Sequence, residues 1–579
     1  MNEFIARWRY KGADVCLAGC LLLLIFGVYA PVRHFAYINY DDPVYVTLNR
    51  HVTEGLTKDS LRWAFTSGAD ANWFPTTWIS LMAVRQFFGP GPGPQHVFNV
   101  VIHAASALIL FALLKRLTGT RLPSALVAFL FALHPQHVQS VAWVTERKDV
   151  LSALFWMLAL CSYAVYVATR RWGAYLLTLL LYCLGLMAKP MVVTLPLVLI
   201  LMDLWPLGRV STATPRTIFA RQGVRTLIWD KLPFFVLSMV VSAVTYYVQQ
   251  SGEAVRPLDE WPPSRRLANA VVSAATYIAK LVWPSHLAVY YPSHPPPRVW
   301  QVAAAACLLV ALTAVAVLAI RTRPYLAVGW FWYVITILPV IGIVQVGEQS
   351  RADRYTYIPG IGLSIMLAWS FANVYEWWPK GRPVLMGLGI AAGVACLLAT
   401  SKQISYWQNS RTLFQHAIEV TQDNEIAHGC LGEALRAEGR YQDALAEYRM
   451  ALAIDPRYVA ALINYGSVLG TLGRLDEAMV PLKTAIRLKR DDPDAHHALG
   501  LALALQGHLQ EAYTQFETAV LLNPDSVSAH TDLGKTLGNL GRIDDAIAQF
   551  SEALRLQPDA VEARAGLEKA LSIKHPRQN

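Results

Sequence analysis

Charged residues are scarce in this chain. Asp, Glu, Lys and Arg together make up 16% of its 579 residues, whereas soluble domains contain about a quarter. With a hydrophobic fraction of 54%, this scarcity excludes a purely soluble protein and places much of the chain in lipid. In such a protein, the formal net charge of +10 indicates basic loops that face anionic lipid, and no nucleic-acid partner is expected.

The sequence also lacks a disulfide framework and a signal-peptide cleavage site. Six of the seven cysteines lie in apolar runs, and only Cys430 lies in the polar C-terminal part. The first apolar run, 13–30, has basic flanks but no clear small-residue cleavage site, so we interpret it as a retained anchor. The Gly-Pro run at 89–94 lacks a following Lys-Ser/Thr pair, which argues against a phosphate-binding loop.

Long apolar runs dominate the first 401 residues. Crossing a bilayer requires about 20 apolar residues, and eleven segments qualify, some of them marginally. We expect spans at roughly 13–30, 97–114, 122–133, 149–169, 173–187, 190–206, 232–249, 300–320, 325–345, 358–377 and 383–401. Two further segments are amphipathic. Residues 73–88 suit a helix at the membrane interface, and residues 266–283 suit an interfacial or re-entrant helix.

The distribution of basic residues predicts the orientation of these spans. With the N-terminus in the cytoplasm, the cytoplasmic loops hold 17 Lys and Arg in about 55 residues, and the opposite loops hold 15 in about 146. This asymmetry follows the positive-inside rule. We therefore predict a multi-pass inner-membrane protein in which the loop after the first span, and everything after residue 401, lies on the periplasmic side.

The chain after residue 401 is polar and repeats every 34 residues. The period is marked by Gly439, Gly473, Gly507 and Gly541, by Gly432, Gly466, Gly500 and Gly534, and by Ala444, Ala478, Ala512 and Ala546. It is typical of tetratricopeptide helix-turn-helix units, in which small residues let paired helices approach closely. We predict a connecting helix at 402–423, four repeats at 424–559, and a capping helix and tail at 560–579. The predicted fold class is all-α, with a polytopic membrane module at 1–401 followed by an α-solenoid.

Two adjacent carboxylates, Asp41 and Asp42, open the first predicted outer loop. A carboxylate can accept the proton of an attacking hydroxyl, so either residue is a candidate catalytic base. Alternatively, the pair caps or hydrogen-bonds the turn that Pro43 begins. Because Pro43 restricts Asp42 to extended geometry, the sequence favours Asp42 as an orienting group and Asp41 as the base.

Further ionisable residues cluster where the predicted outer loops meet the membrane, and such residues are costly near lipid. Cations stabilise charge that develops on a departing phosphate. We predict a phosphate site made of Arg147, Lys148, Lys189, Arg351, Arg354 and Tyr355, supported by His134, His137, Glu146, Asp149 and Asp353. The alternative is interfacial snorkelling and loop ion pairs. The proline between the two histidines favours a hydrogen-bonding role over metal ligation.

Four stretches carry a resemblance to a known family. They are Tyr40-Asp41-Asp42-Pro43, His134-Pro135 through Arg147-Lys148-Asp149, Met187-Ala188-Lys189-Pro190 and Asp353-Arg354-Tyr355. With the repeats behind them, they resemble the GT-C glycosyltransferases with a C-terminal tetratricopeptide domain, whose animal members are the TMTC-type transmembrane O-mannosyltransferases. The resemblance covers essentially the whole chain, and the Glu-Arg-Lys-Asp run at 146–149 looks closer to bacterial relatives.

This resemblance implies a polyprenyl-phosphate-linked sugar donor, catalysis at the extracytoplasmic membrane face, and inverting transfer with Asp41 or Asp42 as base. We expect a Ser or Thr hydroxyl of a protein acceptor, recruited by the repeats, to receive the sugar. No cofactor is expected besides this donor substrate, and dependence on a divalent metal is left open. One alternative is a GT-C enzyme that modifies a lipid or glycan. Another is a non-enzymatic scaffold, which the density of charge at the membrane face disfavours.

Overall fold

The computed structural model describes residues 12–209, 228–252, 254–257 and 261–575. The chain divides into two compact units, Met1–Gln422 and Asp423–Asn579. The described residues fold into helices, and the β-type pairing among them is limited to two isolated bridges, Val255 with Val346 and Tyr291 with Arg351. The predicted all-α class is therefore confirmed.

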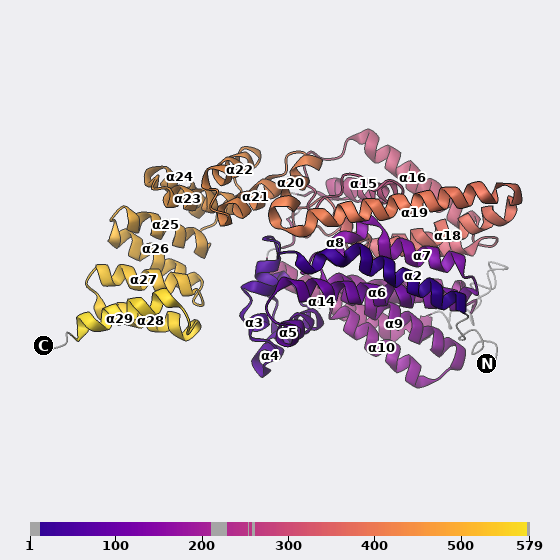
Figure 1. Cartoon of the computed structure of the whole chain (residues 1–579), viewed down its shortest axis with the longest axis horizontal. Helices are drawn as coiled ribbons and strands as arrows, with labels where there is room; N and C mark the ends of the chain where they lie inside the picture. Colours follow the sequence, from indigo (N-terminus) through magenta and orange to yellow (C-terminus); the bar gives the residue numbers. More distant parts are fainter. Residues whose placement is uncertain (1–11, 210–227, 253, 258–260, 576–579) are drawn as a thin grey trace. The chain divides into compact units, whose positions relative to one another are not determined.

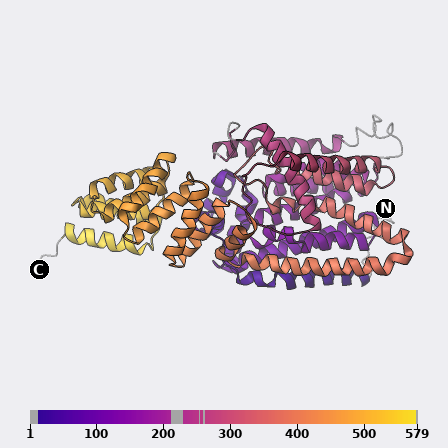
Figure 2. The same ribbon diagram turned by 90° about the horizontal axis from the view of Figure 1, so that it is seen from above.

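Six helices among the described residues of the first unit are long and apolar enough to cross a membrane. They are α2 (Gly12–Tyr29, continued by η1 to His34), α6 (Pro92–Thr118), α9 (Arg147–Thr169), α14 (Leu232–Ser251), α16 (Val299–Leu318) and α19 (Arg382–Ser405). A helix rises 1.5 Å per residue, so about 20 residues cover the 30 Å hydrocarbon core of a bilayer. The long helices of this unit run nearly parallel to one another (Figures 1 and 2).

The remaining five predicted spans are helical as well. Four of them are shorter apolar helices: α7 (Leu122–Leu133), α10 (Trp172–Leu186), η5 with α11 (Pro190–Leu204) and α17 (Pro324–Ile337). The fifth, α18 (Pro359–Trp377), has 19 residues. Each of the eleven segments contains a helix, but α17 ends at Ile337, so residues 338–345 of the predicted segment 325–345 lie in the loop that follows. The number of spans stays a prediction.

Helices α17 and α18 touch through their backbones. A Cβ atom on Gly329 would lie 2.5 Å from the carbonyl oxygen of Gly362, and the reverse contact is equally tight. Small residues allow such close approach between membrane helices. The loop 338–358, which joins the two helices, is therefore held at both ends by one tightly packed pair.

The loop between η1 and α6, which is predicted to lie outside and which we call the first outer loop, is a packed substructure of short helices. They are α3 (Arg50–Glu54), α4 (Lys58–Thr66) and α5 (Pro75–Phe88), and α5 confirms the helix predicted at 73–88. Asn49 and Thr57 cap the first two, accepting hydrogen bonds from the backbone N–H groups of Val52 and Ser60. In the core of the loop, the rings of Tyr45 and Trp78 stack at 4.8 Å. This packing gives the loop a fixed shape.

Helix α15 (Pro263–Val282) corresponds to the second amphipathic segment. It is not among the six long apolar helices, and its polar residues Asn269, Ser273 and Lys280 are buried in the protein. The amide of Asn269 donates to the carbonyl oxygen of Ser350 at 2.7 Å. The polar row thus packs on loop 338–358.

Helix α20 (Ser410–Val420) and the turn before it lie at the end of the first unit. Trp407 packs on Trp143 with ring centroids 5.8 Å apart, and Phe414 packs on Tyr40 at 6.3 Å. The backbone N–H of Asn39 donates to the Ser410 hydroxyl at 2.9 Å. The segment after residue 401 therefore packs on Trp143 and on the two residues that precede Asp41.

The second unit is a stack of helix pairs followed by a final helix (Figure 1). The pairs are α21 (Glu425–Ala437) with α22 (Tyr441–Ile454), α23 (Val459–Thr471) with α24 (Leu475–Leu488), α25 (Pro493–Leu505) with α26 (Leu509–Leu522), and α27 (Val527–Asn539) with α28 (Ile543–Leu556), and the final helix is α29 (Val561–Lys574). This arrangement confirms the predicted tetratricopeptide solenoid.

Two rows of glycines explain how each pair is built. Within each pair, a glycine faces a large side chain, and an added Cβ would come within 2.6 to 2.8 Å of it. These contacts join Gly432 to Tyr448, Gly466 to Leu482, Gly500 to Phe516 and Gly534 to Phe550. Gly439, Gly473, Gly507 and Gly541 have φ between +74° and +85° in the turn between the two helices, where glycine avoids strain.

Candidate active site

A cavity of about 680 Å³ lies beside the first outer loop, and we call it the main cavity. Its polar lining includes Tyr40, Asp41, Asp70, Asn72, Lys148, Lys189, Gln249, Gln345, Gln349, Arg354 and Tyr355. Its apolar lining includes Phe74, Pro190, Met191, Val193, Val340, Val344 and Val346. Five residues predicted for the site, Asp41, Lys148, Lys189, Arg354 and Tyr355, therefore meet around one space although they come from distant parts of the sequence.

Glu146, in the turn before α9, is fully buried and lies close to three cations. Its Oε1 is 3.4 Å from Lys148 Nζ and 3.1 Å from Arg354 Nε, and its Oε2 is 3.6 Å from Lys189 Nζ. Burial alone would raise the pKa of Glu146, but these three positive charges outweigh burial and hold the pKa below its usual range. The carboxylate is therefore ionised and holds the cations at the cavity wall.

Asp149, one turn further along, is the second carboxylate of this network. It accepts hydrogen bonds from Lys189 Nζ and from the Ser140 hydroxyl, the latter at 2.9 Å. Burial alone would lower the pKa of Lys189, but the negative charges of Asp149 and Glu146 outweigh burial and raise the pKa of Lys189. Two buried carboxylates, Glu146 and Asp149, thus hold three cations at one wall of the main cavity. We call Lys148, Lys189 and Arg354 the cation cluster.

Asp41 lines the main cavity and is half-buried. Burial raises the pKa of its carboxyl group to about 6, against the opposing positive charges of Lys148 and Arg354. A carboxylate with a pKa in this range is ionised at neutral pH and accepts a proton more readily than one with an ordinary pKa. Asp41 is therefore the carboxylate of the pair that faces the main cavity, and it stays the candidate base.

Asp42 is turned away from the main cavity and is fully buried. Its Oδ2 accepts a hydrogen bond from the backbone N–H of Ile38 at 2.8 Å. Its Oδ1 accepts from Thr145, from the backbone N–H at 3.0 Å and from the hydroxyl at 2.5 Å. Asp42 thus ties the first outer loop to the turn that carries Glu146. The predicted extended geometry at Asp42 is wrong, because its backbone is helical (φ −58°, ψ −34°) and leads into the short helix Pro43–Thr47.

Arg147, predicted to support the phosphate site, does not line the main cavity. Its guanidinium donates to Gln95, to the backbone oxygen at 2.8 Å and to the side-chain oxygen at 3.0 Å, and also to Ser80 and Asn99. Successive residues of a helix point about 100° apart, so Lys148 reaches the cavity while its neighbour points elsewhere. The structure corrects the sequence-based placement and makes Arg147 a bridge between α9 and α6.

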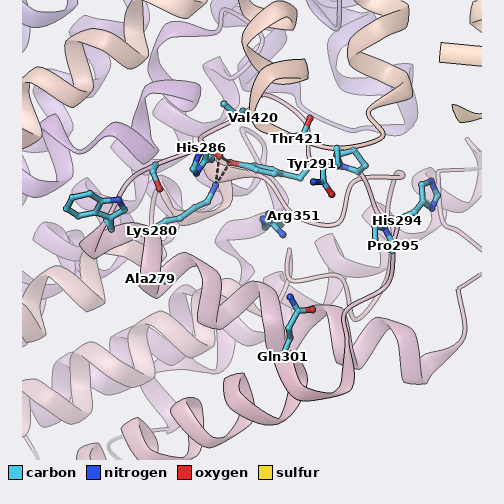
Figure 3. A pocket seen from close by; sticks show the side chains of 14 residues that line it. Ala279, Lys280, His286, Tyr291, His294, Pro295, Gln301, Arg351, Val420 and Thr421 are labelled. Atoms are coloured by element: carbon cyan, nitrogen blue, oxygen red, sulfur yellow. Dashed lines mark hydrogen bonds between the residues drawn. The ribbon is translucent and has the colours of Figure 1, made fainter. Parts of the chain in front are cut away.

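Arg351 and Asp353 were predicted for the same site, but neither lines the main cavity. Arg351 lines a second cavity of about 610 Å³ (Figure 3). Asp353 accepts a hydrogen bond at 2.6 Å from the hydroxyl of Tyr291, which also lines this cavity. The backbone is extended at Ala352, so successive side chains of this segment point to different sides. Arg354, three residues after Arg351, is directed to the main cavity.

His134 and His137 line neither cavity. His134 Nε2 is hydrogen-bonded to the carbonyl oxygen of Leu281 at 3.0 Å, and His137 Nδ1 to that of Phe131 at 2.7 Å. Burial lowers their pKa values to about 3 and about 4, so both rings are neutral near pH 7. His134 thus joins the end of α7 to α15, and His137 ties the turn after α7 back to that helix. Within the described ranges, no group of three or more His, Cys, Asp or Glu is placed to hold a metal ion.

Asp70 is a cavity residue that the sequence analysis missed. It lines the main cavity, and its negative charge adds to the burial that raises the pKa of Asp41. Asp70 and Ala71 both adopt left-handed backbone angles, with φ of 55° and 54°. Such angles cost about 1–3 kcal/mol each and persist where the surrounding structure imposes them. The small and polar run Gly68–Asn72 indicates a turn, but no pattern links it to Asp41.

Comparison with protein families gives two kinds of match. The family model described as dolichyl-phosphate-mannose-protein mannosyltransferase matches residues 78–223, a range that includes Lys148 and Lys189. Models of the tetratricopeptide repeat match residues 407–459, 435–502, 493–526 and 531–567. Both modules predicted from the sequence thus have counterparts in known families.

Curated relatives extend across both modules. Protein O-mannosyl-transferase Tmtc1 of Drosophila melanogaster is 23% identical, with 77% of this chain and 62% of the relative covered. TMTC1 of Homo sapiens is 23% identical, with coverages of 66% and 48%, and human TMTC4 is 24% identical, with 61% and 54%. The chain spans about half to three-fifths of the length of these relatives. The similarity confirms the resemblance to the TMTC type.

Among solved structures, the tetratricopeptide protein YrrB aligns at 25% identity with a TM-score of 0.25, covering 28% of this chain and 85% of its own.

Proposed function

We propose that this protein is an integral membrane glycosyltransferase. It transfers one sugar from a polyprenyl-phosphate-linked donor to a Ser or Thr hydroxyl of a protein acceptor. The observation that carries the proposal is the meeting of Asp41, a candidate base, with the cation cluster in the main cavity. The similarity to proteins named O-mannosyl-transferases supports the reaction class.

In the proposed reaction, the acceptor oxygen attacks the anomeric carbon of the sugar. The bond from that carbon to the phosphate oxygen breaks, and its electron pair leaves with the polyprenyl phosphate. Asp41 takes the hydroxyl proton. Attack from the side opposite the leaving phosphate inverts the configuration at the anomeric carbon.

The cation cluster offers donors of positive charge to this leaving group. The donor is a phosphodiester with one negative charge, and further charge develops on the phosphate as the bond breaks. Lys148, Lys189 and Arg354 are fixed before any substrate binds, so they stabilise that charge without having to rearrange. The side chains of Met191, Val193 and Val340 line the same cavity and suit the apolar start of a polyprenyl chain.

We place the main cavity and the repeats on the periplasmic side of an inner membrane, because the predicted cytoplasmic loops carry the higher density of Lys and Arg. We assign acceptor binding to the repeats, since tetratricopeptide solenoids offer extended surfaces to polypeptide segments. The proposed partners are therefore the lipid-linked sugar, a protein acceptor and the bilayer itself.

The direct test is transfer of radiolabelled mannose from polyprenyl-phosphate-mannose to protein in membranes that contain the full chain. We expect label on Ser or Thr, released by mild alkali, and its loss in Asp41→Asn. Label in a lipid or glycan would favour the alternative enzyme, and absence of transfer to any acceptor would favour the scaffold.

A second test separates donor chemistry from acceptor recruitment. A chain that ends at Gln422 retains the whole first unit, including the Trp407 and Phe414 contacts. We expect it to bind and slowly hydrolyse the donor but to lose transfer to protein. Undiminished protein glycosylation by this chain would assign the repeats to assembly.

A further inference from the structure

The second cavity has a basic lining. Fourteen residues line it, and none of these lining residues is acidic, while Lys280, Arg351, His286 and His294 are basic (Figure 3). The lining comes from the end of α15, the loop that leads to α16, the first turn of α16, loop 338–358 and residues 420–422. Such a cavity attracts an anion, although Asp353, which does not line it, lies 3.5 Å from Lys280 and compensates part of its charge.

Lys280 is fixed in position at this cavity. It is buried, and it donates hydrogen bonds to the Tyr291 hydroxyl and, at 3.0 Å, to the carbonyl oxygen of His286. Asp353 Oδ1 is 3.5 Å away. Burial lowers the pKa of Lys280, and the charge of Arg351 lowers it further while Asp353 opposes this. An anion between Lys280 and Arg351 would favour the charged form of the amine.

Arg351 offers hydrogen-bond donors that the described residues do not use. Its guanidinium lies over the Tyr291 ring, 4.4 Å from the centroid, and its Nε is buried without a hydrogen-bond partner among those residues. No ion pair joins it to a carboxylate in that part of the chain. A planar guanidinium in this state can bind two oxygens of one phosphate side by side.

The rim of the cavity is apolar and aromatic. Trp283, which lines the cavity, is 76% exposed, and Trp300, the neighbour of the lining residue Gln301, is 64% exposed at the start of α16. Their neighbours Val282 and Val299 are exposed as well. Helix α16 is long and apolar enough to cross a membrane, so its first turn lies near the interface, where tryptophan is enriched. Gln301, in that first turn, lines the cavity.

We propose that the second cavity binds the phosphate of an anionic membrane phospholipid between Lys280 and Arg351. The lipid chains would then cover the exposed Trp283 and Trp300 side chains, as at other basic pockets that bind lipid head groups. An acidic peptide or a free phosphate would satisfy the same cations but would leave this apolar rim in water. The site is separate from the proposed sugar transfer, which uses the main cavity.

The test is native mass spectrometry of the delipidated full chain, titrated with phosphatidylglycerol or phosphatidylcholine. We expect one phosphatidylglycerol to bind with clear preference. Arg351→Gln should weaken this binding about tenfold to a hundredfold, because it removes a charge-assisted hydrogen-bond donor. Arg351→Lys should recover part of the affinity. The matched control is Arg323→Gln, since Arg323 is exposed in another loop and lines neither cavity.

Equal affinity of the parent and a folded Arg351→Gln chain would overturn the proposal, as would an equal loss in Arg323→Gln. Displacement of the lipid by inorganic phosphate at a comparable concentration would overturn the proposal in favour of a site for soluble anions. Displacement by an acidic peptide would overturn it in favour of a peptide site. Retention of the lipid against both competitors supports the proposal.

Discussion

Arg354 Nε lies 3.1 Å from Glu146 Oε1, and this ion pair joins loop 338–358 to the turn that precedes α9. Both side chains are largely buried, so each compensates the charge of the other. Breaking a buried pair by removing one partner costs about 3–5 kcal/mol, because it leaves an unpaired charge. The pair therefore fixes the geometry of the cation cluster relative to Asp41.

The two aspartates should respond differently to the same substitution. Asp41→Asn removes the proposed base and should lower turnover about 10²–10⁴-fold while stability and donor affinity stay near those of the parent. Asp42→Asn weakens the bonds from Ile38 and Thr145 and should cost about 1–3 kcal/mol of stability. Transfer rates, donor affinity and thermal unfolding of both variants test this. Near-parental turnover of Asp41→Asn would remove the assignment.

The cation cluster should be needed for donor binding. Lys189→Ala and Arg354→Ala should each weaken binding of a polyprenyl-phosphate sugar about tenfold or more, because each removes a charge-assisted contact. Arg354→Lys should also bind more weakly, since an ammonium does not reproduce the guanidinium fork. Lys380→Ala and Arg323→Ala are matched controls at exposed positions. The idea fails if the cluster variants bind the donor as tightly as these controls.

Turnover should rise with pH between about 5 and 7. Asp41 acts as a base only when ionised, and burial raises its pKa to about 6, so protonation below that pH removes activity. The phosphodiester donor does not titrate in this range. The measurement is kcat/KM against pH at constant ionic strength, with unfolding monitored in parallel because the pKa of Asp42 is also raised by burial to about 6. A profile that stays flat down to pH 4 would contradict the assignment.

The C-terminal repeats should lie outside the cytoplasm. The asymmetry of basic residues predicts this orientation, so a reporter that is active only in the cytoplasm should be silent when fused after Asn579. A fusion at a predicted cytoplasmic loop, after Arg323, should be active and serves as the control. Strong activity of the C-terminal fusion would show that the number of spans differs by one.

The sequence predicted the repeats in detail because their signals are local and periodic. Gly432 must face Tyr448, and Gly439 must adopt a positive φ, so the same positions are glycine in every repeat. The members of the candidate site were harder to select. Ionisable residues near lipid indicate a site, but their direction depends on packing between distant segments.

Arg147 and Lys148 illustrate this limit. They are adjacent in the sequence and carry the same charge, yet only Lys148 lines the main cavity. Similarly, Arg351 and Arg354 line different cavities, because the backbone is extended at Ala352 and then enters a short 3-10 helix, which the sequence does not reveal. Asp70 went unnoticed because its contribution arises only when the first outer loop is folded.

The contact between Gly329 and Gly362 gives the two cavities a common mechanical support. With no side chain between the two glycines, the backbones of α17 and α18 pack directly on each other. Loop 338–358, which joins these two helices, supplies Arg354 to the main cavity and Arg351 to the second cavity. A movement of α17 and α18 would therefore displace Arg351 and Arg354 together. A change of this loop that alters one cavity also alters the other.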